Sequence, residues 1–175
     1  MTDSPRPPGR VLYLVVCAAP PARRIGELID LLQQGGGWSV YVIPTPTAMT
    51  WVDAPRLAAQ TGHPVRAESR GPDEPTWLPP ADTIAVVPAT FNTINKWAAG
   101  INDTLALGVL NEAFGLGLPV LVSPYAKPAL TAHPAFSRSL ATLKAAGADL
   151  TETEAIRPAS DNQSFGWQVI TDALQ

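Results

Sequence analysis

The chain has 175 residues, of which 46% are hydrophobic and only 15% charged, and its formal net charge is −3. This length suits one domain, and the composition excludes global disorder because so apolar a chain can offset the entropy lost on folding. The 12 basic and 15 acidic residues form no basic cluster, so the charge pattern does not indicate a nucleic-acid-binding protein. The low charge favours association of subunits through apolar surface.

The sequence also argues against disulfide, metal and membrane chemistry. Cys17 is the single cysteine and the two histidines are far apart, so neither an internal disulfide nor a cysteine-based zinc site is expected. The longest apolar run, residues 11–19, is about half of what a membrane-spanning helix needs. A signal peptide is the minor alternative, because residues 14–17 are weakly similar to a lipoprotein cleavage box. We therefore expect a cytoplasmic protein without a metal.

The first elements predict a tail followed by a β-α-β unit. Residues 1–10 are polar and proline-rich, which is typical of a disordered tail. Residues 11–17 are apolar and β-branched without alternation, the pattern of a strand buried on both faces of a parallel sheet. A helical apolar period over residues 21–34 ends in three glycines, and residues 38–43 predict the second strand.

Strands and helices continue to alternate along the rest of the chain. We expect a helix over residues 49–59, a short strand over 64–68, and a proline-rich, aperiodic functional loop or flap over 69–80. The following elements are a strand at 83–87, helices around 94–98 and 103–114, a strand at 119–122 and a helix at 134–146. Residues 150–156 and 166–174 follow with weaker patterns.

This alternation predicts an α/β fold, a three-layer α/β/α sandwich around a parallel, Rossmann-like (flavodoxin-like) sheet. Residues 11–175 form the single domain. Ligands of such folds bind at the carboxyl ends of the strands, so the loops after Cys17, Ile43, Val87 and Val122 are the candidate binding loops.

The loop after Val87 is the most informative of these. It reads Pro-Ala-Thr-Phe-Asn-Thr over residues 88–93 and leads directly into a helix. Hydroxyl and amide side chains beside the free N–H groups of a helix start suit a polar, anionic ligand. The alternative is that Thr90 or Asn92 only caps the helix.

The longer run from residue 88 to 105 resembles the signature of the flavoprotein family of homo-oligomeric, flavin-containing cysteine decarboxylases. This family includes phosphopantothenoylcysteine decarboxylase and the lantibiotic peptidyl-cysteine decarboxylases. The signature is Pro-Ala-Ser/Thr-Ala-Asn-Thr-x-x-Lys-x-Ala-x-Gly-Ile-x-Asp-x-Leu. The matching residues are Pro88, Ala89, Thr90, Asn92, Thr93, Lys96, Ala98, Gly100, Ile101, Asp103 and Leu105. The more distant flavin prenyltransferases fit less well, because no basic cluster suits a prenyl phosphate.

The resemblance implies an FMN cofactor and a trimer, or trimers of higher order, in which neighbouring subunits complete the site. Carried over by position, Thr90 and Asn92 contact flavin, and Thr45 binds the phosphate or the ribityl chain. The full set of implied cofactor-binding residues is Ala18, Ala19, Thr45, Pro88, Ala89, Thr90, Asn92, Thr93 and Ser123.

The first turn departs from the family pattern. Ala19 stands where the family has a phosphate-binding serine, which removes a hydrogen bond worth roughly 1.5–3 kcal/mol. Pro20 and Pro21 also remove two N–H donors. We expect weaker FMN binding unless Arg23 or Arg24 compensates.

The catalytic positions depart as well. Glu74 stands where the decarboxylases have a histidine, and Lys127 replaces the asparagine of their substrate-binding motif. Both methionines of that motif are lost, and Thr131 replaces its tryptophan. The catalytic candidates are therefore Lys127, Glu74 and Asn92, with solvated surface charges as the alternative for Lys127 and Glu74. His63 and His133 are expected at the surface.

The sequence therefore predicts an FMN-binding, homo-oligomeric flavoprotein, a decarboxylase-like lyase whose reaction has diverged from cysteine decarboxylation. One alternative is an active decarboxylase with a rearranged pocket, acting on a cysteinyl peptide or small cysteine derivative. The other is a non-catalytic binding or regulatory subunit. The expected partners are a small-molecule or peptide substrate and further copies of the chain, with neither nucleic acid nor a membrane.

Overall fold

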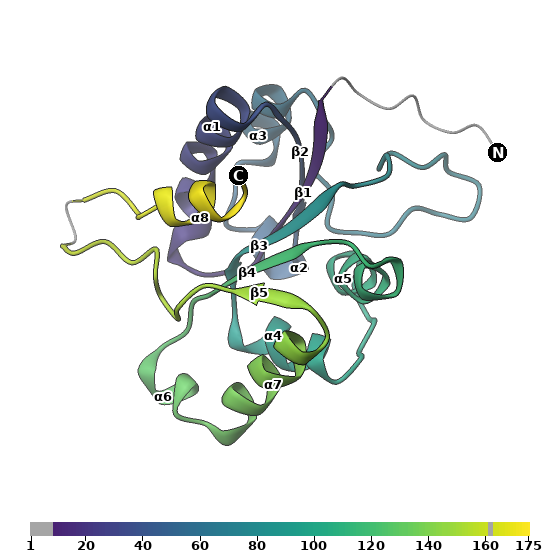
Figure 1. Cartoon of the computed structure of the whole chain (residues 1–175). Helices are drawn as coiled ribbons and strands as arrows, with labels where there is room; N and C mark the ends of the chain where they lie inside the picture. The colour runs from purple at the N-terminus through teal and green to yellow at the C-terminus, as the bar shows by residue number, and fades with distance from the viewer. Residues whose placement is uncertain (1–8, 161–162) are drawn as a thin grey trace.

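The computed structural model describes residues 9–160 and 163–175 and contains a five-stranded parallel sheet between layers of helices (Figure 1). The strand order is β2-β1-β3-β4-β5. The strands are β1 (Arg10–Val16), β2 (Trp38–Pro44), β3 (Thr83–Ala89), β4 (Val120–Pro124) and β5 (Ala148–Leu150). The predicted α/β/α sandwich is confirmed.

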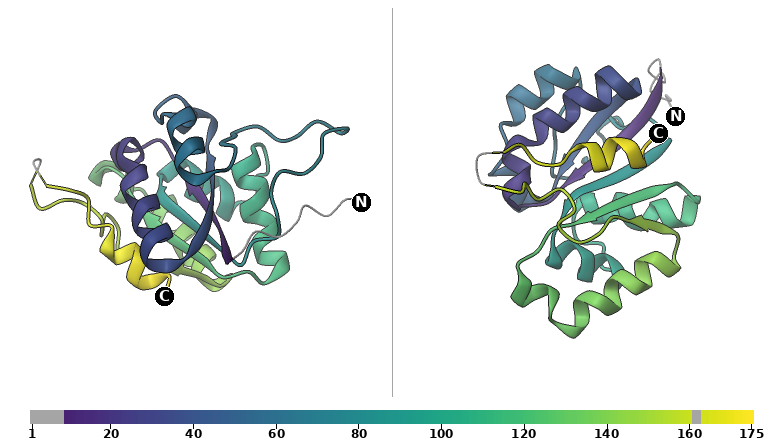
Figure 2. Two further views of the ribbon diagram at one scale, coloured as in Figure 1. Left: turned by 90° about the horizontal axis from the view of Figure 1, so that it is seen from above. Right: turned by 60° about the vertical axis from the view of Figure 1, so that its left-hand side comes forward.

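Helices cover both faces of the sheet. As a result, every β1 residue from Val11 to Val16 is buried. The helices are η1 (Pro20–Arg24), α1 (Ile25–Gly36), α2 (Pro46–Met49), α3 (Ala54–Thr61), α4 (Phe91–Ala98), α5 (Leu105–Leu116), α6 (Pro128–Thr131), α7 (Pro134–Ala145) and α8 (Gln168–Ala173). One core lies under α1 and α8, and the other under α4, α5 and α7 (Figure 2). Within the described residues, no helix is long and apolar enough to cross a membrane.

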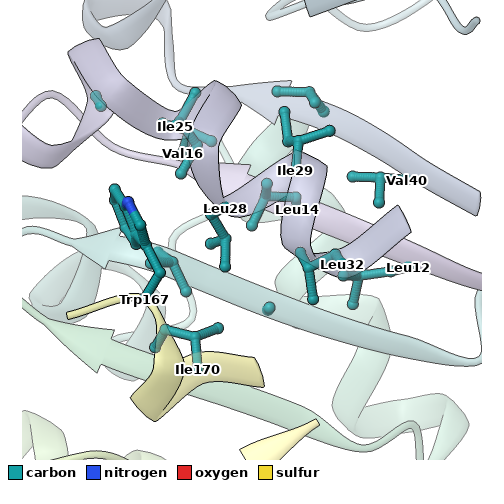
Figure 3. Close-up of a cluster of buried hydrophobic side chains, with 14 of the residues drawn as sticks. Leu12, Leu14, Val16, Ile25, Leu28, Ile29, Leu32, Val40, Trp167 and Ile170 are labelled. Atoms are coloured by element: carbon teal, nitrogen blue, oxygen red, sulfur yellow. The ribbon is translucent and has the colours of Figure 1, made fainter. Parts of the chain in front are cut away.

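The core under α1 joins the two ends of the chain. Leu12 and Leu14 of β1 face Leu28 and the other apolar residues of α1, and Ile170 of α8 packs on the same cluster (Figure 3). Trp167, just before α8, is buried and donates its indole N–H to Glu27 of α1 at 2.9 Å. The C-terminal segment is therefore part of the domain core.

Three predicted elements differ from the structure. β1 begins at Arg10, which the sequence assigns to the tail, while residues 1–8 lie outside the described part. Residues 64–68 form no strand, because Val65 packs into the core without pairing. The helix expected over residues 49–59 is split into α2 and α3, because Asp53 begins a new helix by accepting a hydrogen bond from the Arg56 N–H.

The predicted flap, residues 69–80, lies within the loop between α3 and β3, residues 62–82, which extends away from the body (Figures 1 and 2). Its base is fixed at the amino end of the sheet, where the Tyr13 hydroxyl donates to the Pro79 carbonyl. Burial raises the pKa of Tyr13 to about 12, so this phenol remains a donor throughout the neutral range. The Asp82 carboxylate also accepts from the Val11 N–H at 2.7 Å.

We predict that Leu14→Ala destabilises the domain by about 2–5 kcal/mol, because it removes a fully buried side chain from the centre of β1. Leu31→Ala is the matched control, since Leu31 of α1 is 42% exposed and leaves no cavity when shortened. Urea unfolding of both variants measures the difference. Equal losses in the two variants would contradict this view of the core.

Candidate functional site

A cavity of about 840 Å³ lies at the carboxyl ends of the strands. The loops after all five strands contribute to its wall. The chain leaves β1 toward β2 on one side and continues with β3 on the other, so the strand order reverses between β1 and β3. Open parallel sheets bind ligands at this switch point, and the volume falls within the roughly 300–1,000 Å³ of small-molecule sites.

Most of the predicted site residues meet in this cavity. Its lining includes Ala18, Ala19, Thr45, Thr90, Asn92, Thr93 and Lys127. Pro88, Ala89 and Ser123 do not line it, because they are buried within β3 and β4. Ser123 instead accepts a hydrogen bond from the Thr151 hydroxyl at 3.2 Å. These three residues belong to the strand ends that carry the cavity loops.

Glu74 lies elsewhere. It belongs to the exposed part of the flap, where its carboxylate pairs with Arg66 at 3.3 Å and its carbonyl accepts from Arg70 at 2.8 Å. The flap is attached at the amino ends of the strands, whereas the cavity lies at their carboxyl ends. Within one subunit, the structure does not bring Glu74 to the other candidate residues, contrary to what the sequence suggests for a catalytic acid or base.

The start of α4 supplies polar groups to the cavity. Thr90 is the N-cap residue, but its side chain does not cap the helix; its hydroxyl donates to the Thr93 hydroxyl at 3.4 Å. Asn92 is exposed and lines the cavity, and its amide makes no hydrogen bond with any described residue. The first N–H groups of a helix also have no acceptor within the helix. A ligand here therefore meets several donors that the protein leaves unused.

The remainder of the signature has a structural role. Lys96 of α4 forms an ion pair with Asp103 in the loop before α5. Gly100 follows the end of α4 with φ +71°, a conformation that costs other residues free energy. The Ile101 N–H then donates to the Lys96 carbonyl at 2.9 Å. These contacts fix the connection between α4 and α5, so the signature's lysine, glycine and aspartate shape the site, and Lys96 also lines the cavity.

The first turn, after β1, is poor in side-chain donors. Ala18, Ala19 and Pro20 line the cavity, and Ala19 is the N-cap residue of η1 without a side-chain cap. Both nearby arginines have partners outside this turn. Arg24 pairs with Glu27 and hydrogen-bonds the Ser164 hydroxyl at 3.1 Å. Arg23 instead stacks over the ring of Trp51, 5.3 Å from its centre.

The wall after β4 and β5 contains groups that sequence reasoning missed. Tyr125 follows β4 beside the predicted Lys127, and Glu154 and Arg157 follow β5. Arg157 lies over the Tyr125 ring, 5.1 Å from its centre, and its Nε donates to Glu154 at 2.8 Å. The rule that ligands bind at strand ends would have found this pair if the three-residue β5 had been located correctly.

Neither histidine lines the cavity. His63 is stacked on Tyr41 with centroids 3.9 Å apart and lies 2.9 Å from the Ser39 hydroxyl. Burial lowers the pKa of His63. The Nδ1 atom of His133 caps α7 by accepting from the Ala135 N–H at 3.1 Å. Among residues 9–160 and 163–175, no group of three acidic, histidine or cysteine side chains could hold a metal ion.

The chain is similar in sequence to a protein family and to several characterised relatives. The family model described as Flavoprotein matches residues 4–171. The coenzyme A biosynthesis bifunctional protein CoaBC of Thermococcus kodakarensis is 29% identical over 145 residues, which is 79% of this chain and 36% of that protein. A cysteine/cysteine sulfinic acid decarboxylase from an unknown prokaryotic organism is 31% identical over 102 residues, covering 55% of this chain and 28% of the relative. The chain thus spans about a third of these relatives.

Solved structures share the fold. The FMN-dependent cysteine decarboxylase SpaF superimposes with a TM-score of 0.75 and 22% identity over 95% of each chain. A PPC decarboxylase mutant complexed with pantothenoylaminoethenethiol gives a TM-score of 0.75 and 19% identity, covering 95% of this chain and 96% of that chain. Both comparisons extend across nearly the whole domain.

Cys17 provides a direct test of the buried floor beneath the site. It is fully buried, its thiol donates to the Thr93 hydroxyl at 3.3 Å, and burial raises its pKa. We predict that a disulfide reagent at pH 8 modifies it at least about tenfold more slowly in the native protein than in guanidinium, because both access and the thiolate are suppressed. Since this is the single cysteine, equal rates would contradict the packing of the β1 end.

Proposed function

The chain belongs to the flavoprotein family, and from that membership we propose that it binds FMN as a homo-oligomer and is a flavin-dependent enzyme diverged from the cysteine decarboxylases. The observation that carries the proposal is the cavity at the switch point of the sheet. The start of α4 brings to it Asn92, whose amide has no hydrogen-bond partner among the described residues. A cytoplasmic location is part of the same proposal.

The residues present fit a flavin. Ala18 and Ala19 leave room at the floor, because their side chains end at Cβ, and the α4 start offers N–H donors beside the Thr90 hydroxyl. FMN supplies redox chemistry when bound. We propose Thr45 for the phosphate end, because its hydroxyl accepts from the Ala48 N–H at 3.3 Å and retains its own proton for donation.

The residues of the cavity wall after β4 and β5 support a reaction that has diverged from cysteine decarboxylation. Tyr125, Lys127, Glu154 and Arg157 form this wall, and the asparagine and methionines that the resemblance implies are absent. Burial raises the pKa of Tyr125, so its hydroxyl remains protonated near neutrality. Lys127 and Asn92 are the groups we propose to contact the reacting substrate.

Flavin binding is the first test. We predict that purified protein binds FMN, with a change in the flavin absorbance spectrum and release of FMN on denaturation. Asn92→Ala should weaken binding about tenfold, the effect of one lost hydrogen bond of ~1.4 kcal/mol. Gln34→Ala is the matched control, because Gln34 lies exposed on α1 away from the cavity. A protein that remains colourless with excess FMN would rule out the proposal.

Assembly is the second test. Leu116 of α5 is 72% exposed and shares a surface hollow with Trp77 and Leu78 of the flap, so apolar surface is available there for a second copy. We predict a particle of three times the 18.5 kDa chain mass, or a multiple of it, by light scattering. A monomer at micromolar concentration would refute the oligomer.

A further inference from the structure

One hydroxyl group of the cavity wall has no partner in the chain. Tyr125 is the first residue after β4, and it lines the cavity although only 7% of it is exposed. Its hydroxyl forms no hydrogen bond with any residue that the structure describes. Polar groups of buried residues are normally hydrogen-bonded, so an exception calls for an explanation.

The open side of this hydroxyl faces the cavity. Within residues 9–160 and 163–175, the indole nitrogen of Trp97 is the one enclosed side-chain nitrogen or oxygen atom without a hydrogen-bond partner. If the Tyr125 hydroxyl were enclosed, it would be a second such atom, so it keeps contact with open space. Since the residue is otherwise buried and lines the cavity, that open space is the cavity.

The Tyr125 ring is held in place by its neighbours. Its backbone N–H donates to the Ala89 carbonyl at 2.8 Å, which places the residue beside the start of α4. The Arg157 guanidinium lies over the ring, 5.1 Å from its centre. Phe165 meets the ring edge-to-face, with centroids 6.5 Å apart. The hydroxyl therefore has a fixed direction before any ligand binds, as preorganised donors of active sites have.

The surroundings keep this hydroxyl protonated and stabilise the anion that it forms. Burial raises the pKa of Tyr125, the Arg157 cation lowers it, and the Glu154 carboxylate raises it. Glu154 accepts from the Arg157 Nε at 2.8 Å, so this ion pair helps to hold the cation over the ring. The phenol is thus a neutral acid near pH 7 with a cation beside its phenolate.

The other titratable groups of the wall are less suited to giving a proton at a fixed point. Lys96 pairs with Asp103, and Glu154 pairs with Arg157. Lys127 is exposed, and its ammonium forms no ion pair or hydrogen bond with any described residue that would fix its position. The phenol is therefore the oriented and unused donor among these groups.

We propose that the Tyr125 hydroxyl is the proton donor of this site. The inference rests on the proposed function, because it assigns one step of a reaction that releases carbon dioxide in the same cavity. When the bond to the substrate's carboxylate carbon breaks and carbon dioxide leaves, the electron pair stays on the substrate. Tyr125 gives its proton to that anion, and the phenolate takes a proton from water. The step is redox-neutral, so it needs no oxidant beyond the FMN of the proposed function.

The first arm of the test examines the hydroxyl itself and needs neither cofactor nor substrate. The chain has three tyrosines, so their acetylation by N-acetylimidazole can be followed one by one with peptide mass spectrometry. Tyr125 should react about tenfold faster than Tyr13, whose bond to the Pro79 carbonyl must first break. Equal or slower acetylation of Tyr125 would overturn the inference, because the hydroxyl would then be closed to a substrate.

The second arm measures the carbon dioxide that the FMN-loaded protein releases from N-acetyl-L-cysteine and from a hexapeptide ending in cysteine. Tyr125→Phe should lower kcat at least about hundredfold with little change in KM, the effect of losing a general acid. Tyr41→Phe is the matched control and should keep the wild-type kcat. It removes the same group from a buried tyrosine that is stacked on His63 outside the cavity.

The flavin absorbance spectrum shows whether each variant is folded and loaded. A loaded Tyr125→Phe variant with the wild-type kcat would overturn the inference and leave the proposed function intact. Loss of FMN binding in this variant alone would make the hydroxyl a cofactor contact and refute its role as proton donor. No carbon dioxide from the loaded wild type with either probe would refute the decarboxylase-like chemistry, and the role of Tyr125 with it.

Discussion

The hydrogen bonds at the end of β3 determine where the cavity can form. The Cys17 N–H donates to the Pro88 carbonyl at 3.1 Å, and the Tyr125 N–H donates to the Ala89 carbonyl at 2.8 Å. These bonds extend the pairing of β3 with β1 and β4 past the regular strands. The loops after β1, β3 and β4 are therefore held side by side. The polar start of α4, which follows β3, lies between the loops after β1 and β4.

The signature divides into residues that build this arrangement and residues that remain available. Lys96, Gly100 and Asp103 connect α4 to α5 and have their interactions within the chain. Thr90 and Asn92 lie at the cavity, and the amide of Asn92 has no hydrogen-bond partner among the described residues. A fold can thus preserve its ligand-binding frame while the neighbouring loops change, as they do here at the first turn and after β4.

Hydrophobic pattern was sufficient to predict the central strands and the helices that cover them, because burial on both faces leaves a clear signal. The signature also pointed to Thr90 and Asn92, which line the cavity, and their contact with flavin stays a prediction. The pattern could not locate the three-residue β5, and so it missed Glu154 and Arg157, whose position depends on how far that strand extends. Val65 was misread as part of a strand, because its burial comes from packing and not from pairing. The position of Glu74 relative to the cavity depends on the long flap, whose path has no periodic signal.

The burial of Cys17 makes the chain a natural background for site-selective labelling. Because the single thiol is enclosed beneath the cavity, a cysteine introduced on an exposed helix such as α7 would be the one accessible to a maleimide dye. Fluorophores could then report distances between subunits, or movements of the flap, without first replacing a native residue of the core.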